Sequence, residues 1–320
     1  MMKFSFNEKE VNFGEKTKIC GILNVTKDSF SDGGKFYRFE DALNHAKELI
    51  DSGVYMIDIG GESTRPGSTY VEIKDEIEKT APIIREIKKR WDIPISIDTW
   101  KSEVAKEAIK EGADVINDIT GLLGDEKMPE VLKESRAGLI LMFNPVIARP
   151  SHESAKIFPK FGKNPFTKEE LEKFTKMDII ELEKTYFKYA LNRLEKFNIQ
   201  KERVVLDPGI GFGLTKKENL LLIKNIDIIH KMGYLSYLGV SRKRFVQNIL
   251  GENNIENNVE TEEGYKNRDI ATSVLSTIGQ MSSVSFIRVH SVLESKIAVE
   301  VSNAVRMAEK EEDINFGAYR

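Results

Sequence analysis

Short apolar runs recur along the chain, and each ends in a polar or glycine-rich stretch. Most are followed by a charged stretch with helical periodicity. The eight runs are KICGILNVT, VYMIDIGG, IPISIDT, ADVINDITG, GLILMF, RVVLDPGIG, YLSYLGVS and SFIRVHS. Nearly continuous apolar strands that alternate with amphipathic helices are typical of a parallel sheet whose outer face is covered by helices. Eight such units predict an α/β fold, a (β/α)8 TIM barrel of eight parallel strands.

The stretch 101–111, KSEVAKEAIKE, illustrates the helical pattern. Its apolar residues share one face and its charged residues lie on the other, and Gly112 supplies a C-terminal stop. An open doubly wound sheet would normally show fewer strands and a G-x-G-x-x-G after the first strand. Here the first strand runs into NVTKDSFSDGG, so the closed barrel is favoured.

Four segments fall outside this rhythm, and we expect all of them to belong to one domain spanning 1–320. The stretch of about 144–201 predicts a mobile loop followed by one long helix. Residues 251–268 are polar and acidic and predict a solvated loop before a helix at 269–280. Residues of about 1–17 form a short N-terminal extension, and about 308–320 form a frayed tail.

Composition narrows the class of protein. With 40% hydrophobic residues among 320, the chain can bury a large core, which excludes a disordered or fibrous protein. A net charge of −3 provides no positive field for nucleic acid or an anionic membrane, and no apolar run approaches the roughly 20 residues of a bilayer span. The single cysteine, Cys20, excludes an intramolecular disulfide and a Cys-rich zinc site. We therefore expect a cytoplasmic protein without nucleic-acid or membrane partners.

Polar groups stand at the predicted C-terminal ends of the strands, where TIM barrels carry their reactive groups. In chain order they are Asn24, Asp58 with Glu62, Asp98, Asn117, Met142 with Asn144, Asp207, Ser241 with Lys243, and Arg288 with His290. A helix cap explains a polar residue at any single position, but it explains the whole set poorly.

Asp98, Asn117 and Asp207 converge with Lys243 in this layout. Together they offer donors and acceptors to a planar nitrogen heterocycle such as a pterin or a purine. A carboxylate accepts two parallel N–H bonds from an amino-pyrimidine edge, and we assign that role to Asp207. The alternative for Asp207 is a turn cap in the sequence DPG.

A second group of strand-end residues is electropositive and lies beside the loops GGESTRPGS and GVSRKRF. It comprises Arg65, Arg242, Lys243, Arg288 and His290. Such groups bind phosphate or pyrophosphate, although SRKR is also explained as a solvated basic run. Alternation puts Arg288 and His290 on one face of their strand, and an interior arginine needs an anionic partner.

The sequence offers no paired histidines or cysteine cluster for a fixed zinc ion. Hard oxygen ligands such as Asn24 suit Mg²⁺ held through a phosphate group, so Mg²⁺ is the expected cofactor.

These residues resemble the dihydropteroate synthase family. The matching stretches, in order along the barrel, are GILNVTKDSFSDGG (21–34), DIGGESTRPGS (58–68), SIDTWKSEVAKEAIKEGADVINDITG (96–121), LDPGIGFGLT (206–215), GVSRKRF (239–245) and RVHSV (288–292). The resemblance implies a transferase of folate biosynthesis that condenses hydroxymethyl-dihydropterin pyrophosphate with para-aminobenzoate. The products would be dihydropteroate and pyrophosphate, formed by an ionising, SN1-like mechanism.

Carried over position by position, the resemblance implies three sets of site residues. The pterin set is Asp98, Asn117, Asp207 and Lys243, with Ile119, Met142 and Phe212 as apolar walls. The pyrophosphate and Mg²⁺ set is Asn24, Arg288 and His290, assisted by Thr64 and Arg65. Para-aminobenzoate would lie near Pro66 and the GVSRKRF loop, from which Gly239, Ser241 and Arg242 complete the binding residues. The catalytic residues would be Asp28, Lys243, Arg288 and His290, with Asp28 stabilising the transient cation.

The resemblance further implies inhibition by sulfonamides and a homodimer formed through helices near the C-terminus. Four positions depart from the family pattern. They are Lys27 in place of proline, Phe143 in place of histidine, Leu214 where lysine is frequent, and Ser291 in place of aspartate. Two alternatives stay open at this point: a divergent pterin-binding homologue with weak or altered activity, and a pterin-dependent methyltransferase.

Overall fold

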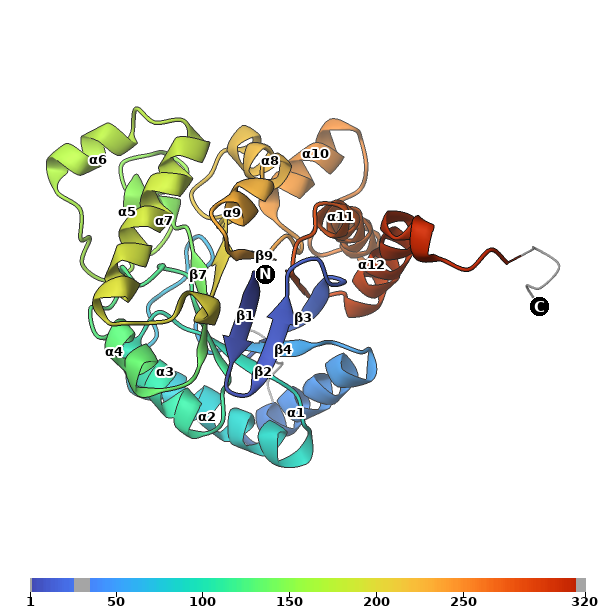
Figure 1. Ribbon diagram of the computed structural model, residues 1–320, viewed down its shortest axis with the longest axis horizontal. Coiled ribbons are helices and arrows are strands. Elements are labelled where there is room, and N and C mark those ends of the chain that lie inside the picture. The colour runs from blue at the N-terminus through green and yellow to red at the C-terminus, as the bar shows by residue number, and fades with distance from the viewer. Residues whose placement is uncertain (1, 26–34, 315–320) are drawn as a thin grey trace.

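The computed structural model describes residues 2–25 and 35–314. Its centre is a closed barrel in which β10 and β3 pair to close the ring in the order β10-β3-β4-β5-β6-β7-β8-β9 (Figure 1). All eight neighbouring pairs are parallel. The barrel strands are β3 (Lys18–Asn24), β4 (Met56–Gly60), β5 (Ile95–Asp98), β6 (Val115–Asp118), β7 (Gly138–Met142), β8 (Val204–Asp207), β9 (Leu235–Leu238) and β10 (Phe286–Val289). Each lies inside one of the eight apolar runs, so the predicted TIM barrel is confirmed.

Helices cover the outside of the barrel (Figure 1). They are α1 (Lys35–Asp51), α2 (Ile73–Arg90), α3 (Ser102–Lys110), α4 (Met128–Glu134), α5 (Pro145–Ala148), α6 (Lys168–Phe174), α7 (Ile179–Lys196), α8 (Lys216–Lys224), α9 (Asp227–Lys231), α10 (Arg244–Glu252), α11 (Glu262–Met281) and α12 (Val292–Arg306), with short 3-10 turns at Lys201–Arg203 and Ala308–Lys310. The helix predicted from 101–111 is α3, and its apolar residues Val104, Ala105 and Ala108 are buried. No helix in the described ranges is long and apolar enough to cross a membrane.

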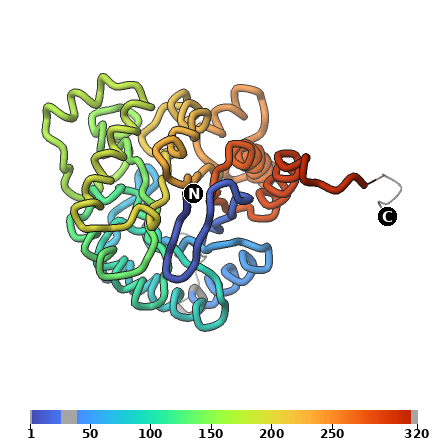
Figure 2. Tube along the Cα trace, in the orientation of Figure 1, coloured from blue at the N-terminus to red at the C-terminus, as the bar shows by residue number. Residues whose placement is uncertain are grey.

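The N-terminal extension is an ordered hairpin of β1 (Lys3–Phe6) and β2 (Lys9–Asn12), which pair antiparallel. Figure 2 shows this hairpin crossing one end of the barrel. Phe4 and Phe6 are buried there, and a Cβ added to Gly138 of β7 would lie 2.5 Å from the Phe4 ring. The hairpin therefore closes the N-terminal end of the barrel, leaving the opposite end for a site.

The predicted solvated loop over 251–268 is confirmed for 253–261, which are mostly exposed, but both of its ends are helical. Helix α10 reaches Glu252, and α11 begins at Glu262 after its N-cap Thr261, whose side chain accepts a hydrogen bond from Gly264. The acidic residues that resembled a loop fill the first turn of α11, where negative charge is stabilised by the helix dipole. The polar sequence at Glu262 and Glu263 therefore belongs to the solvated N-terminus of α11.

The stretch 144–201 contains three helices where the pattern predicted one. After α5, residues 149–167 follow without a regular element, and α6 then begins at a capping box formed by Thr167 and Glu170. The predicted long helix is α7, whose N-cap is Asp178. Thr167 and Asp178 are separate start signals, so two helices form.

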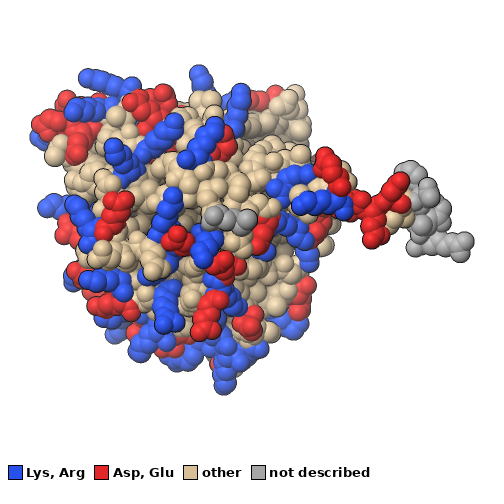
Figure 3. Space-filling view, viewed as in Figure 1, with Lys and Arg blue, Asp and Glu red and all other residues tan. Residues whose placement is uncertain are grey.

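Charges of both signs alternate over the face seen in Figure 3, without a large area of one sign. This distribution agrees with the near balance of 48 basic and 51 acidic residues. The tail up to residue 314 extends away from the body in Figure 2, and the remainder of the predicted frayed tail, 315–320, lies outside the described residues.

Candidate active site

Strand register brings the predicted residues together at the C-terminal end of the barrel. Asp98 of β5 is paired with Asn117 of β6, and Met142 of β7 is paired with Asp207 of β8. Both pairs come from consecutive strands, and the closed ring of parallel strands brings the C-terminal ends of all eight to one end of the barrel, as the strand-end pattern predicted.

Arg288 lies at the centre of a buried ionic network. Its Nε donates to Asp58 Oδ2 at 2.5 Å, and its Nη2 donates to Asp98 Oδ2 at 2.8 Å. Burial opposes its charge, but Asp58 and Asp98 outweigh burial and raise the pKa of the guanidinium. The anionic partners that an interior arginine requires are therefore supplied by the protein itself.

Asp58 is the main residue that sequence reasoning missed. Its carboxylate is fully buried and also accepts hydrogen bonds from Ser96 Oγ at 2.5 Å and from Asn117 Nδ2 at 3.1 Å. It thus fixes both Arg288 and the Asn117 amide, two predicted binding groups. Its place among the polar strand ends was the signal, but position alone did not show what it bonds.

The carboxyl groups of the site have unusual acidity. Burial raises the pKa of Asp98 to about 7. The negative charge of Asp58 also raises this pKa, and the positive charge of Arg288 lowers it. Burial also raises the pKa of Asp207 to about 6, opposed by the Gly209 backbone N–H and by Lys243. Both groups therefore titrate near neutral pH.

Asp207 combines the two roles considered for it. Its Oδ1 accepts from the Gly209 N–H at 2.7 Å, which is the turn cap of DPG. Its Oδ2 faces Gly239, where an added Cβ would lie 3.8 Å away. The glycine keeps that side of the carboxylate open, so one oxygen shapes the turn while the other is available for a ligand.

Lys243 is the N-cap residue of α10, and its Nζ lies 5.2 Å from the centre of the Phe212 ring. Gly211, with φ of +88°, makes room for its side chain, because an added Cβ would lie 2.8 Å from Lys243 Cδ. Burial lowers the pKa of Lys243 to about 8, opposed by Asp207. The ammonium is thus held over an aromatic wall beside Asp207.

His290 and Ser241 form a hydrogen-bonded pair. Ser241 Oγ lies 3.0 Å from His290 Nδ1 and accepts from the His290 backbone N–H at 3.1 Å. Burial, together with the charges of Arg242, Arg288, Arg65 and Lys243, lowers the pKa of His290 well below 6.5. A neutral imidazole whose pKa is lowered by four cationic side chains lies in a region of positive potential, which suits an anion.

Arg242 has partners other than a ligand. Its guanidinium makes two bonds to Asp269 of α11, at 2.7 and 2.8 Å, and lies over the Tyr265 ring. Its backbone φ is +52°, a conformation that turns the chain after β9. The predicted contact between Arg242 and substrate therefore stays a prediction.

The loop 61–72, which follows β4, carries Thr64, Arg65 and Pro66. It is anchored by Glu62, which accepts from the Val71 N–H at 2.8 Å, Trp100 Nε1 at 2.9 Å and Lys101 Nζ at 3.1 Å. The Lys101 ammonium is itself buried and also bonds Glu76 at 2.7 Å. Glu62, which the sequence placed among the polar strand-end residues, therefore holds this loop in place.

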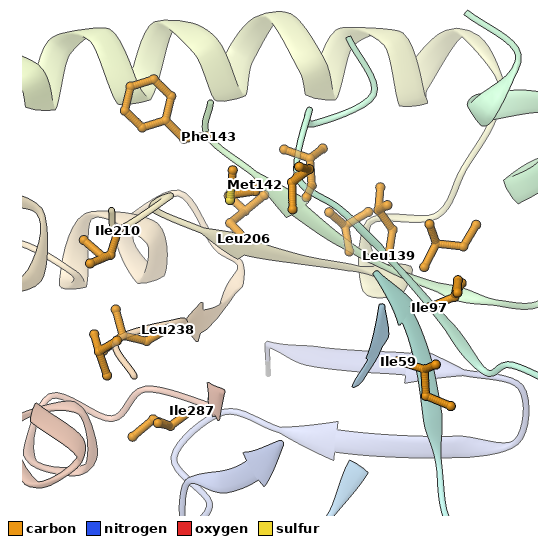
Figure 4. Close-up of a cluster of buried hydrophobic side chains, with 14 of the residues drawn as sticks. Ile59, Ile97, Leu139, Met142, Phe143, Leu206, Ile210, Leu238 and Ile287 are labelled. Atoms are coloured by element: carbon orange, nitrogen blue, oxygen red, sulfur yellow. The ribbon is translucent and has the colours of Figure 1, made fainter. Parts of the chain in front are cut away.

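Two of the other strand-end predictions serve the fold. Asn144 caps α5 by accepting from Val146 and donates to the Ile119 carbonyl at 2.8 Å. Met142 and Phe143 lie among the buried apolar side chains of Figure 4. Phe143 contacts Tyr186 and Phe187 of α7, with ring centres 5.3 and 6.3 Å apart. Phe143, which stands in place of the family's histidine, therefore packs in the apolar core.

The predicted apolar walls have different exposure. Ile119 and Met142 are buried, and Phe212 is half-buried. Leu214 packs against the core, and Ser291 is the N-cap residue of α12 without a side-chain cap bond. Asp28 and Lys27 lie outside the described residues.

Asn24 ends β3 and lies close to Asp98. A Cβ built on Gly60 would lie 3.6 Å from both Asn24 Oδ1 and Asp98 Oδ2, so both oxygens lie beside this glycine. No cluster of three or more His, Cys, Asp or Glu side chains suited to a metal occurs in ranges 2–25 and 35–314. The donors present fit a hard cation such as Mg²⁺ that takes its remaining ligands from a bound phosphate or water.

Comparison with known proteins agrees with this geometry. The family model for pterin binding enzymes matches residues 20–290. The dihydropteroate synthase of Clostridium beijerinckii is 38% identical over 297 residues, which is 93% of this chain and 97% of that protein. The chain belongs to the dihydropteroate synthase family of pterin-binding enzymes. The family recognised from the sequence motifs is therefore confirmed.

Solved dihydropteroate synthases have the same fold. One from Clostridium difficile, determined with pteroic acid, is 36% identical, covers 92% of this chain and 98% of its own, and gives a TM-score of 0.76. One from Xanthomonas albilineans with 4-aminobenzoic acid is 26% identical, covers 96% and 99%, and gives a TM-score of 0.78. Both match nearly the full length of the barrel described above.

Proposed function

We propose that this protein is a dihydropteroate synthase that joins hydroxymethyl-dihydropterin pyrophosphate to para-aminobenzoate in folate biosynthesis. The products are dihydropteroate and pyrophosphate. One observation carries the proposal: acidic groups for a heterocycle and a cationic centre for an anion meet around Arg288 at the open end of the barrel. A methyl-transferring pterin enzyme would have no use for the second of these.

The pterin lies against Asp98, Asn117, Asp207 and Lys243 in this proposal. Asp207 Oδ2 accepts from the amino-pyrimidine edge, because its other oxygen is held by Gly209. The Asn117 amide is oriented by its bond to Asp58, which leaves its carbonyl oxygen as an acceptor for the ligand. A site built before the ligand arrives loses little entropy when it binds.

The pyrophosphate lies near Arg65, Lys243, Arg288 and His290. Ser241 Oγ accepts from the His290 backbone, so its hydroxyl hydrogen is free to donate to Nδ1. The neutral ring then carries its proton on Nε2 and donates it to the anion. Asn24 and the pyrophosphate would together hold Mg²⁺, and the ion would neutralise charge on the leaving group.

The reaction is an ionising substitution. The bond between the pterin methylene carbon and the pyrophosphate oxygen breaks, and the electron pair leaves with the oxygen. The electron-rich pterin spreads the resulting positive charge, with Asp28 as its expected stabiliser. The amine nitrogen of para-aminobenzoate then bonds the methylene carbon, and its proton passes to the departing pyrophosphate or to water. The chain's own cations contribute by holding the departing anion in a preorganised site.

Para-aminobenzoate approaches Pro66 of the loop 61–72 and Ser241 and Lys243 at the start of α10. Sulfonamides share its aniline ring and an anionic or polar para substituent, so they compete for the same position. Xanthomonas albilineans dihydropteroate synthase has been solved with 4-aminobenzoic acid, which supports this class of second substrate.

The test is pyrophosphate release by purified protein supplied with the pterin substrate and Mg²⁺, with and without para-aminobenzoate. We expect release that depends on para-aminobenzoate and is suppressed by a sulfonamide, and its near loss in Arg288→Ala. Saturable pterin binding without pyrophosphate release would instead identify a pterin-binding homologue that does not condense its substrates.

We also propose a homodimer formed through α11 and α12, which lie side by side at one edge of the barrel (Figure 1). Each helix exposes an apolar row with a spacing of three or four residues: Ile270, Val274, Ile278 and Met281 on α11, and Leu293, Ile297, Val301 and Val305 on α12. Exposed apolar rows on two adjacent helices are typical of an interface, and a two-fold axis lets the same surface of a second copy cover them. Sedimentation should show a dimer that Val301→Lys dissociates, and a wild-type monomer would overturn the assignment.

The chain is further proposed to act as one domain in the cytoplasm. The hairpin β1–β2 supports the single domain, because it buries Phe4 and Phe6 against the N-terminal end of the barrel. Denaturant unfolding monitored by two probes should give one coincident transition, and cell fractionation should recover the protein with cytoplasmic markers.

A further inference from the structure

Residues 155–162, here called the bridge, cross the open end of the barrel between α5 and α6. They contact the loops that follow four different strands. Ile157 contacts the loop after β4, Phe161 contacts Trp100 after β5, Gly162 approaches Gly124 after β6, and Phe158 contacts Phe212 after β8. The loops after β4 and β5 already contact each other through Glu62 and Trp100. The bridge adds a connection from these loops to Phe212 in the loop after β8.

One end of the bridge holds the loop that carries Arg65 and Pro66. The Ile157 carbonyl accepts a hydrogen bond from the Gly67 N–H at 3.2 Å. Further along, Phe161 meets the Trp100 ring edge-on at 6.2 Å, and together with Tyr70 these rings line a small cavity of about one water molecule's size beside Glu62. Loop 61–72 is thus packed between its Glu62 anchor and the bridge.

The other contact holds the aromatic wall under Lys243. The Phe158 and Phe212 rings are stacked, with centres 5.7 Å apart and planes inclined by 29°. Lys243 Nζ lies 5.2 Å from the centre of the same Phe212 ring. Phe212 therefore has two neighbours that fix its orientation, one catalytic cation and one bridge residue.

The bridge is close-packed against the barrel loops. A Cβ added to Gly162, whose φ is +62°, would lie 2.0 Å from the Gly124 carbonyl oxygen. Ala155 is buried, and its Cβ is 3.4 Å from the position of an added Cβ on Gly213. Phe158 is half-buried and packs at the edge of the hydrophobic core.

We infer that the bridge fixes the width of the para-aminobenzoate pocket and that Phe158 is a positioning residue for the second substrate. The inference rests on the function proposed above, which puts that substrate between Pro66 and Lys243. Ile157 and Phe158 are adjacent, so one dipeptide ties the Pro66 loop to the Phe212 wall. With both walls held, the amine meets a preformed slot and loses less freedom on binding.

The test compares three variants. Phe158→Ala removes the stacked ring. Phe158→Tyr retains it, and the half-buried position leaves the added hydroxyl access to solvent. Ile157→Ala is the matched control, because the Ile157 side chain is 47% exposed and its contribution is the backbone carbonyl. KM for para-aminobenzoate and kcat are measured at saturating pterin substrate, and hydrogen exchange of the Gly67 amide is measured without substrates.

Phe158→Ala is expected to raise KM for para-aminobenzoate by about tenfold, with a smaller change in kcat, since loosening acts on positioning. Exchange of the Gly67 amide should accelerate in the same variant. Phe158→Tyr and Ile157→Ala should resemble the wild type in both measurements.

The inference is overturned if Phe158→Ala lowers the melting temperature but leaves KM and Gly67 exchange unchanged, since Phe158 would then serve stability alone. An equal rise of KM in Phe158→Tyr would also overturn it, because the ring itself would not matter. Failure of the proposed function is distinguishable: a wild-type protein that releases no pyrophosphate still reports the bridge through Gly67 exchange, and unchanged exchange in Phe158→Ala then refutes it.

Discussion

Asp58→Asn tests the network around Arg288 by removing a charge while keeping a shape. Asp58 Oδ1 accepts from the Ser96 hydroxyl, and Oδ2 accepts from Asn117 and Arg288. An asparagine fits best with its amide nitrogen toward Ser96, because a hydroxyl can also accept a hydrogen bond. Its oxygen then keeps the bonds to Asn117 and Arg288, so the variant loses mainly the negative charge.

The charge affects stability and the acidity of Asp98. A hydrogen bond to a charged group contributes about 1 kcal/mol more than a neutral one, so we expect a loss of roughly 1–2 kcal/mol in unfolding free energy. Asp58 and Asp98 bond two nitrogens of the same guanidinium. Like charges about 5 Å apart repel by roughly 3 kcal/mol at an effective dielectric constant of about 20, which corresponds to about two pH units.

The pKa of Asp98, about 7 in the wild type, should therefore fall by at least about one unit in Asp58→Asn. Asp58 is one cause of the elevated value, and without it Arg288 is paired with Asp98 alone. If pterin binding depends on the ionisation of Asp98, the midpoint of its pH dependence moves to lower pH, whichever form binds better.

The assay is the dissociation constant of a pterin ligand measured across this pH range by calorimetry. Titration of the pterin itself is common to all variants and cancels in the comparison. Asp118→Asn is the control, because Asp118 is equally buried but bonds only Thr120 and the Leu122 N–H. It should lose stability without moving the midpoint. A midpoint that stays near that of the wild type in Asp58→Asn would refute the proposed coupling.

Three further predictions follow from the buried charges. Asp207→Asn should weaken pterin binding by at least about tenfold, measured by calorimetry, because a neutral amide replaces the charged carboxylate oxygen that accepts from the ligand, and charge-assisted hydrogen bonds are roughly twice as strong as neutral ones. Burial raises the pKa of Glu183 from 4.5 to about 8; its stabilising contribution is complete below pH 4.5 and is lost as pH rises through 8. At pH 7, Glu183→Gln should therefore have a higher unfolding free energy than the wild type, by up to about 3 kcal/mol, and should unfold at a higher urea concentration. This difference in unfolding free energy should be absent near pH 4. Lys101→Met removes the cation shared by the carboxylates of Glu62 and Glu76 and should lower the unfolding free energy by about 3–5 kcal/mol. Lys110→Met, at an exposed pair, should change it by less than about 1 kcal/mol.

The fold could be predicted from the sequence because its signals are local. Apolar runs and the helical period of stretches such as 101–111 reflect which face of an element is buried, and each of the eight runs contains one strand. The prediction failed at 262–268, where acidic residues fit both a loop and the first turn of a helix. Only packing along α11, which buries Arg268 and Thr272, decides between them.

The sequence by itself determined which chemical groups stand at the strand ends, since strand ends and alternation are properties of neighbouring residues. It also carried the motifs of the family. The tertiary structure alone decided how those groups are paired. Arg288 bonds Asp58 across 230 positions of sequence, Arg242 turns to Asp269, and Glu62 anchors a loop. Such partners depend on the closure and register of the whole barrel, because a hydrogen bond or ion pair is decided within a few tenths of an ångström, whereas sequence spacing fixes only the strand and face on which a residue lies.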